Sequence, residues 1–262
     1  MKKTLLALTA LIIASGAQAE TYTPKALNDV RRLARQVEYR GEQPVAIFDL
    51  DDTLINTRER NLRIINDFVA QSNVQSRFPQ EVKNLEGLDA MEIHFLMTDT
   101  LKSKSITTPD FLKEINDFWL ARFFTNEFCK DDKPQAGAVK YVRKLYMAGV
   151  KIVYLTGRDT PRMGDGTAQN LRDLGFPLDG DRAMLIMKPE PKQDDLEFKK
   201  SMFPSIAKMG TVVGVFENEP ANVNAHHDAF PEAIAIFLDT VHSPKPDVPA
   251  QGIFWVRDFT GK

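Results

Sequence analysis

Three carboxylates stand at the end of a short apolar segment, and their types and spacing are those of a chemical site. Residues 45–48 are Val-Ala-Ile-Phe, and Asp49, Asp51 and Asp52 follow them closely. The apolar run predicts a buried strand with charged residues at its exit. Because side chains alternate along a strand, Asp49 and Asp51 should project to the same side. Two close carboxylates repel each other, so the pair predicts a bound cation or a shared proton.

This acidic segment has two other interpretations. A calcium-binding loop has similar acidic spacing, but it needs Gly at its sixth position and Glu at its twelfth. Leu54 and Arg60 occupy those positions here, which excludes that loop. A solvated acidic turn is the plainer alternative, and the local sequence alone leaves it open.

Further along the chain, helical and strand-like segments alternate. Apolar residues recur at helical spacing through residues 139–146, and Gly149 ends that predicted helix. Residues 151–155 then predict a buried strand, which is followed by Thr156. Ligands of parallel sheets bind at the carboxyl ends of the strands, so we expect Thr156 and Asp49 at one edge.

Two more apolar segments, residues 183–187 and residues 211–216, predict further strands. Together with the intervening helices they predict an α/β fold with a doubly wound, Rossmann-like parallel sheet. The polar residues that follow these two strands are Lys188, Lys192, Lys199 and Lys200 after the first, and Glu217 and Asn218 after the second.

Residues 58–133 contain no strand alternating with helix and predict a wholly helical insertion. Leu62, Ile65, Phe68 and Val69 would form one apolar face of its first helix. Thr108 is a suitable N-cap before Pro109, which predicts the start of another helix. The many aromatic residues between Phe111 and Phe128 favour a role in a core over a role as a binding surface.

The N-terminus predicts an export signal. Lys2 and Lys3 precede an apolar stretch over residues 4–14, and Ala17-Gln18-Ala19 is a suitable cleavage site before Glu20. The apolar stretch falls short of the ~20 residues that span a bilayer. We therefore expect cleavage after residue 19, a periplasmic location and no membrane attachment afterwards.

Composition narrows the range of partners. The net charge of −2 and the lack of a basic stripe argue against a nucleic-acid polymer as a partner.

The single Cys129 cannot form an internal disulfide, and we expect it to be a buried apolar side chain. His226 and His227 are adjacent, and neighbouring helical side chains point about 100° apart, so a structural role is favoured over a shared metal ion.

Taken in order, these segments resemble the haloacid dehalogenase (HAD) superfamily of hydrolases, in particular its acid-phosphatase-like members. The resemblance begins with the apolar strand and Asp-x-Asp-x-Thr at residues 49–53. It implies that Asp49 is a nucleophile and that Asp51 is a general acid and base. Superfamily members that cleave carbon–halogen bonds generally lack the second Asp, so its presence implies phosphoryl transfer.

The resemblance assigns further roles to the residues after the other strands. It implies that Thr156 is catalytic and that Gly157 and Arg158 bind the phosphoryl group. Lys199 follows the acidic run at residues 194–197, which resembles the run before the active-site lysine of acid phosphatases. The catalytic lysine is therefore predicted to be Lys199, with Lys192 and Lys188 as alternatives.

The fourth segment departs from the family pattern. Glu217 and Asn218 stand where many members have two aspartates, although the following Pro and Asn-Val keep the same spacing. Mg²⁺ prefers oxygen ligands, so the implied metal ligands are Asp49, Asp51, Glu217 and Asn218. A longer Glu beside a neutral Asn leaves Mn²⁺ as an alternative cation.

The predicted organisation is a signal peptide (residues 1–19), a HAD-like core (residues 20–57 and 134–262) and a helical cap (residues 58–133). The predicted function is that of an exported, Mg²⁺-dependent phosphatase. It would hydrolyse a small phosphorylated metabolite through an aspartyl-phosphate intermediate. Two alternatives stay open: a phosphotransferase to alcohol acceptors, and a non-catalytic protein that binds a phosphate ligand.

Overall fold

The structure is a computed structural model that describes residues 21–261. The predicted signal peptide, residues 1–19, lies outside the described residues. Within residues 21–261, no helix is both long enough and apolar enough to cross a membrane.

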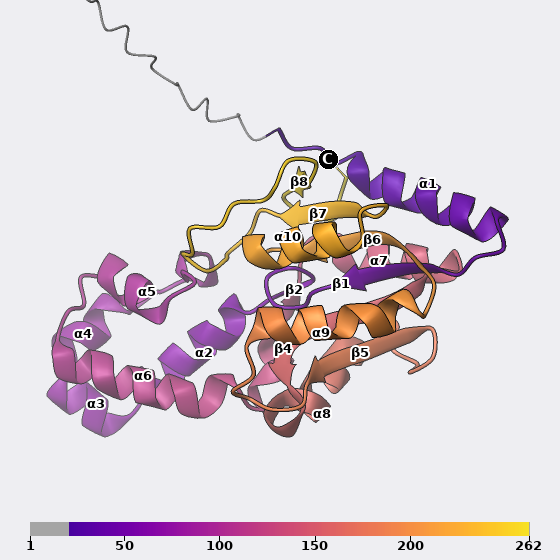
Figure 1. The fold of residues 1–262 in the computed structure, drawn as a ribbon. Helices are drawn as coiled ribbons and strands as arrows, with labels where there is room; N and C mark the ends of the chain where they lie inside the picture. The colour runs from indigo at the N-terminus through magenta and orange to yellow at the C-terminus, as the bar shows by residue number, and fades with distance from the viewer. Residues whose placement is uncertain (1–20, 262) are drawn as a thin grey trace, which may run out of the picture.

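A six-stranded parallel sheet with the order β5-β4-β1-β6-β7-β8 lies at the centre of the molecule (Figure 1). This confirms the predicted α/β, doubly wound fold. Because β4 and β6 flank β1, the residues that follow these three strands meet at one edge of the sheet. The strands are β1 (Pro44–Phe48), β4 (Lys151–Asp159), β5 (Ala183–Lys188), β6 (Thr211–Glu217), β7 (Ile234–Leu238) and β8 (Phe254–Val256).

Helices cover both faces of the sheet, which explains why β1 is apolar at every position. Ala46 and Phe48 pack in one core beneath α1 (Ala26–Tyr39), α7 (Ala138–Met147) and α8 (Thr160–Asp173). Val45 and Ile47 pack in a second core beneath α9 (Asp195–Ala207) and α10 (Pro220–Ala229). Strand alternation thus divides β1 between two cores, and burial on both faces holds the strand firmly in place.

Aromatic packing holds β1 against β6 just before the charged residues begin. The rings of Phe48 and Phe216 are stacked with their centroids 4.3 Å apart. The ring of Tyr141 packs edge-on against both of them. Each phenylalanine is followed directly by an acidic residue, Asp49 or Glu217, so this packing sets the spacing of two carboxylates.

A helical insertion separates β2 (Ile55–Asn56) from β3 (Lys133–Pro134) and extends to one side of the sheet (Figure 1). Its buried aromatic and aliphatic side chains, among them Phe68 and Phe111, form a separate core. Its elements are α2 (Arg58–Val69), α3 (Ser72–Arg77), α4 (Pro79–Asn84), η1 (Ala90–Glu92), α5 (Met97–Ser103), α6 (Pro109–Phe123) and η2 (Phe128–Asp131).

The structure corrects the sequence prediction for the insertion in three details. First, Lys133, the last residue of the predicted helical range, belongs to the short strand β3, which pairs antiparallel with β2 at the base of the insertion. Second, the buried face of α2 consists of Arg60, Ile64, Ile65 and Phe68, whereas Leu62 and Val69 are only partly buried. Third, α6 begins at Pro109 as predicted, but the Thr108 hydroxyl donates to Glu81 instead of capping the helix.

Candidate active site

Asp49, Lys199 and Glu217 form a buried cluster at the carboxyl edge of the sheet. The Lys199 ammonium donates to Asp49 Oδ1 over 2.7 Å and to Glu217 Oε2 over 2.6 Å. All three side chains are at least nine-tenths buried. Lys199 reaches the site from α9. The Asp194 carboxylate caps the N-terminus of this helix by accepting a hydrogen bond from the backbone N–H of Glu197.

The charge of this cluster is not balanced. Burial raises the pKa of Asp49 to about 8, and repulsion from Glu217 acts in the same direction against the opposing pull of Lys199. Burial disfavours the charged form of Lys199, yet the two carboxylates outweigh it and raise its pKa above the ordinary value. Two acids share one ammonium, so the cluster favours one additional positive charge, either a proton or a cation.

The three candidate lysines, of which Lys188 ends β5 and the other two follow it, lie in different surroundings. Lys199 contacts Asp49, as described above. Lys188 instead donates to Asp195 Oδ1 over 2.5 Å, and Lys192 is exposed. Of these three, Lys199 is the one that the structure brings to Asp49.

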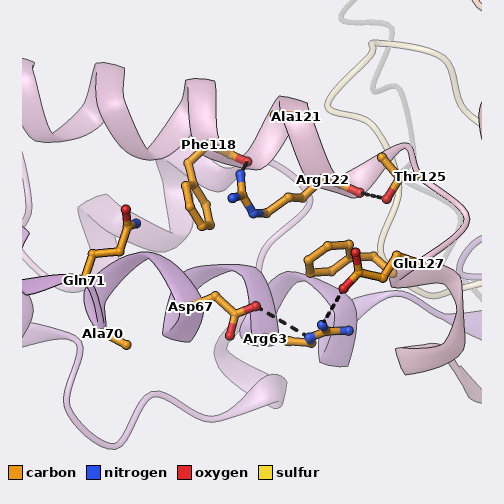
Figure 2. Close-up of a pocket in the computed structure, with 10 residues that line it drawn as sticks. Arg63, Asp67, Ala70, Gln71, Phe118, Ala121, Arg122, Thr125 and Glu127 are labelled. Atoms are coloured by element: carbon orange, nitrogen blue, oxygen red, sulfur yellow. Dashed lines mark hydrogen bonds and ion pairs between the residues drawn. The ribbon is translucent and has the colours of Figure 1, made fainter.

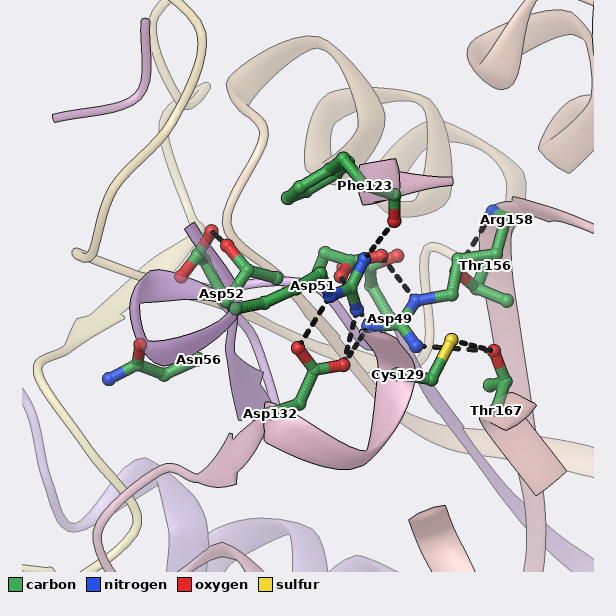
Figure 3. A network of polar contacts seen from close by, with 12 residues as sticks. Asp49, Asp51, Asp52, Asn56, Phe123, Cys129, Asp132, Thr156, Arg158 and Thr167 are labelled. Atoms are coloured by element: carbon green, nitrogen blue, oxygen red, sulfur yellow. Dashed lines mark hydrogen bonds and ion pairs between the residues drawn. The ribbon is translucent and has the colours of Figure 1, made fainter. Parts of the chain in front are cut away.

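Asp51 lies beside the cluster and is held by arginine. Arg158 donates from Nε to Asp51 Oδ2 over 2.9 Å and from Nη2 to Asp51 Oδ1 over 2.6 Å (Figure 3). Burial favours the neutral form of Asp51. The positive charge and hydrogen bonds of Arg158, followed by the positive charge of Arg60, outweigh this effect and hold the pKa of Asp51 below its usual range. Arg158, predicted to bind substrate, is thus buried and paired with Asp51.

Thr156 and Gly157 form an irregular end of β4. Thr156 is fully buried, and its hydroxyl oxygen accepts from the backbone N–H of Arg158 over 3.2 Å. A Cβ atom at Gly157 would lie 2.4 Å from Asp195 Oδ2, so a larger residue here would force the exposed Asp195 side chain to turn away. The two residues therefore shape the strand end against which α9 and Lys199 are placed.

Asn218 ties together the loops around Glu217. Its Oδ1 accepts from the Thr53 hydroxyl over 3.0 Å, and its Nδ2 donates to the Val241 carbonyl over 2.7 Å. Glu217 Oε1 accepts from the backbone N–H groups of Asn218 and Glu219. Through these bonds, Asn218 links Thr53, in the segment that follows β1, to Glu217 at the end of β6.

A divalent cation fits part of the predicted ligand set. Each carboxylate has about four acceptor positions, and Asp49 and Glu217 retain some beyond their bonds to protein donors. Their shared net negative charge also suits a cation. The side chains of Asp51 and Asn218 are engaged by Arg158 and Thr53 instead. Among residues 21–261, no group of three or more His, Cys, Asp or Glu residues forms a metal-type cluster.

Asp52 is a second buried carboxyl group with a displaced pKa. Its backbone has a left-handed φ of 56°, and its carbonyl accepts from Gln135 and from the Thr240 hydroxyl. Burial, followed by repulsion from Asp51, raises the pKa of Asp52 to about 7. Folding therefore favours its protonated form, and Asp52 lowers the stability increasingly as the pH rises from about 4 to about 7.

Asp52→Asn is expected to stabilise the protein at alkaline pH. Asn adopts left-handed backbone as readily as Asp and keeps an oxygen for the Thr57 hydroxyl. Because Asn cannot ionise, its advantage over Asp should grow by about 2–3 kcal/mol between pH 5 and pH 8. Chemical unfolding of both proteins at the two pH values measures this. A difference independent of pH would contradict the raised pKa.

Three functional candidates were missed from the sequence: Arg60, Asp132 and Thr167. All three are fully buried. Thr167 and Asp132 accept from Arg158 (Figure 3), and Arg60 donates to the same Asp132 carboxylate. One signal was present for Arg60, because it lies four residues before Ile64 and eight before Phe68, on the buried face of α2. An arginine in such a position needs a buried acidic partner.

A groove lies on the surface of the helical insertion. It has a volume of about 840 Å³ and runs between α2 and α6 (Figure 2). Arg63, Phe118, Arg122 and Glu127 are among the residues that line it. It contains none of the predicted site residues.

Cys129 is buried as predicted. His226 is buried too: its Nδ1 lies 2.8 Å from the Asn222 carbonyl, and its ring packs on Phe203. Burial lowers the pKa of His226 to about 3, which keeps the ring neutral. These contacts agree with a structural role for His226.

Part of this chain matches a known protein family. Residues 120–222 match the model of the HAD superfamily, subfamily IIIB (acid phosphatase). The match confirms the resemblance to the HAD superfamily. The HAD-type region spans Thr156, Lys199 and Glu217, and it supports the predicted enzyme class, a phosphoric monoester hydrolase. A comparison with curated proteins found no match.

Several solved structures are similar to this chain at low sequence identity. The class C acid phosphatase from Bacillus anthracis with tungstate bound is 16% identical, with 81% of this chain and 74% of that chain covered and a TM-score of 0.43. A putative phosphatase from Clostridium difficile is 15% identical, with 75% and 85% covered and a TM-score of 0.48. A HAD-superfamily hydrolase from Ehrlichia chaffeensis is 12% identical, with 83% and 93% covered and a TM-score of 0.45.

Proposed function

We propose that this protein is an Mg²⁺-dependent phosphatase that hydrolyses a small phosphomonoester through an aspartyl phosphate on Asp49. The observation that carries the proposal is the buried cluster in which Lys199 contacts both Asp49 and Glu217. The HAD subfamily IIIB match over residues 120–222 supports the same reaction class.

In the proposed reaction, the Asp49 carboxylate attacks phosphorus and the bond from phosphorus to the leaving oxygen breaks. Asp51 gives that oxygen a proton, then takes one from the water that hydrolyses the aspartyl phosphate. Lys199 offers positive charge beside Asp49, where the phosphoryl oxygens would lie. Asp51 has a lowered pKa and carries a proton mainly at acidic pH, whereas the raised pKa of Asp49 favours its nucleophilic carboxylate at higher pH or with a cation bound to the cluster.

Asp49 and Glu217 are the side chains that would hold the Mg²⁺ ion. When bound, this cation would offset negative charge on the cluster and on the phosphoryl group. We also propose, from the signal at residues 1–19, that the protein is exported to the periplasm and acts there on a phosphorylated metabolite.

Release of inorganic phosphate from 4-nitrophenyl phosphate, with Mg²⁺ and with chelator, tests the proposed function. We expect turnover with Mg²⁺ and its loss with chelator. Binding of phosphate compounds without turnover would instead favour the non-catalytic alternative. Transfer of the phosphoryl group to added alcohols, at the expense of free phosphate, would favour the phosphotransferase.

Glu217→Gln is expected to weaken Mg²⁺ binding at least tenfold, because the amide keeps the size of the side chain but loses its charge. Isothermal titration of Mg²⁺ into both proteins measures this, independently of activity. Glu232→Gln, an exposed site, is the control and should leave the affinity unchanged. Equal affinities in all three proteins would remove Glu217 from the metal site.

A further inference from the structure

A chain of four charged side chains, three of them buried, links the helical insertion to Asp51. Asp132, immediately before β3, accepts from Arg60 Nε over 2.8 Å and from Arg60 Nη2. The same carboxylate accepts from Arg158 Nη2 over 2.7 Å. Arg158 in turn holds both oxygens of Asp51 (Figure 3). The four charges sum to zero, as a buried group of this kind requires.

The members of this chain differ in their freedom to move. Asp132 and Arg60 are completely buried, and the side chain of Arg158 is 2% exposed. The side chain of Asp51, by contrast, is 36% exposed. The three buried groups therefore form a fixed support, and Asp51 is the member that faces open space.

The distances show what Asp132 prevents. Arg60 Nη2 lies 3.9 Å from Asp51 Oδ1, too far for a hydrogen bond but close enough to move into one. Asp132 holds two nitrogens of Arg60, and the Phe123 carbonyl holds the third over 3.1 Å. Without Asp132, Asp51 would be the nearest carboxylate for Arg60, because no other acidic side chain pairs with Arg60 among the described residues.

We propose that Asp132 is a positioning residue for the phosphatase reaction: it holds Arg60 away from Asp51 and steadies Arg158, so that the Asp51 carboxylate, paired with Arg158, keeps its orientation toward the leaving group. This inference rests on the proposed function. Arg60 lies at the start of the insertion and Asp132 at its end, so the closure of the insertion on the core determines how Asp51 is placed.

Asp132→Asn tests the proposal when it is assayed against substrates of different leaving-group ability. An alkyl phosphate needs a proton on its leaving oxygen, whereas 4-nitrophenyl phosphate hardly does. We expect kcat for the alkyl phosphate to fall about 10²-fold and kcat for 4-nitrophenyl phosphate to fall less than about tenfold. Asp51→Asn should show the same selectivity.

Asp131→Asn is the matched control. Asp131 is the neighbouring residue and also joins α2 to η2, through Arg63 at 2.7 Å, but it makes no contact with Arg158 or Asp51. This variant should lower kcat for both substrates equally, if at all. The same selectivity in Asp131→Asn as in Asp132→Asn would overturn the proposal, because general loosening of the insertion would explain both.

The double variant Arg60→Met with Asp132→Asn gives the sharpest test. It removes one charge of each sign and also removes the side chain that would capture Asp51. We expect it to recover at least about tenfold of the alkyl-phosphate kcat lost in Asp132→Asn, and to fold even where the single variant does not. If circular dichroism shows that the double variant is folded and its alkyl-phosphate kcat does not recover, the proposal is overturned.

The activities of Asp49→Asn and Asp132→Asn together separate the role of Asp132 from the proposed reaction itself. If Asp49→Asn is inactive but Asp132→Asn loses equal activity on both substrates, the inference is wrong and the phosphatase assignment stands. If Asp49→Asn is fully active, the proposed reaction is wrong, and the role of Asp132 in it is wrong as well.

Discussion

Asp49→Asn is expected to abolish phosphatase activity while the protein keeps its fold. An amide is a poor nucleophile, so losing the covalent step should lower kcat by at least ~10³-fold, or about 4 kcal/mol of transition-state stabilisation. The fold should survive because burial and Glu217 already disfavour the charged form of Asp49. The Asn side chain also leaves the ion pair of Lys199 with Glu217 in place.

Phosphate release and circular dichroism of the purified variant measure these two effects. Asp52→Asn is the matched control, since it neutralises a buried carboxyl three residues away whose side chain accepts from Thr57. It should retain most of the activity. More than a tenth of wild-type turnover in folded Asp49→Asn would show that another group is the nucleophile.

Lys199→Met is expected to lose both activity and stability. Without the ammonium, the buried Asp49 and Glu217 carboxylates lack a cationic partner, which should lower the free energy of unfolding by about 3–5 kcal/mol. Loss of positive charge beside the reacting phosphoryl group should lower kcat by at least ~10²-fold. Chemical unfolding and phosphate release measure the two losses.

The stability loss of Lys199→Met should depend on pH in a defined direction. Removing the ammonium raises the pKa of both carboxyls further, so the folded protein binds more protons than the unfolded one and its stability falls as the pH rises. The loss should therefore be smaller at pH 5 than at pH 8. A loss that is equal at both pH values would contradict the charged cluster.

Two variants separate charge from packing. Lys200→Met changes the next residue of α9, which is half-exposed and pairs with Glu197, and should alter stability by no more than about 0.5 kcal/mol. The double variant Lys199→Met with Glu217→Gln removes one charge of each sign. It should regain most of the stability but none of the activity, since the positive charge beside Asp49 is still missing.

Local patterns in the sequence determined the elements that carry the site. The apolar runs before Asp49, Thr156 and Glu217 are buried strands, because a strand covered by helices on both faces must be apolar throughout. Parallel strands share one carboxyl edge, so the order of these segments was enough to predict that their polar ends lie together. Lys199 was predicted from the family resemblance, and the structure brings its ammonium to Asp49.

Only the tertiary structure decided how these charges are paired. Arg60 and Asp132 are 72 positions apart, and they meet because the two-residue strands β2 and β3 close the base of the insertion. Strands that short have no periodicity to recognise. The partner of a buried charge is the oppositely charged group that folding brings within hydrogen-bond distance. Spacing along the chain could therefore indicate that Arg60 is buried, but it could not indicate that Arg60 shares Asp132 with Arg158 or stands next to Asp51.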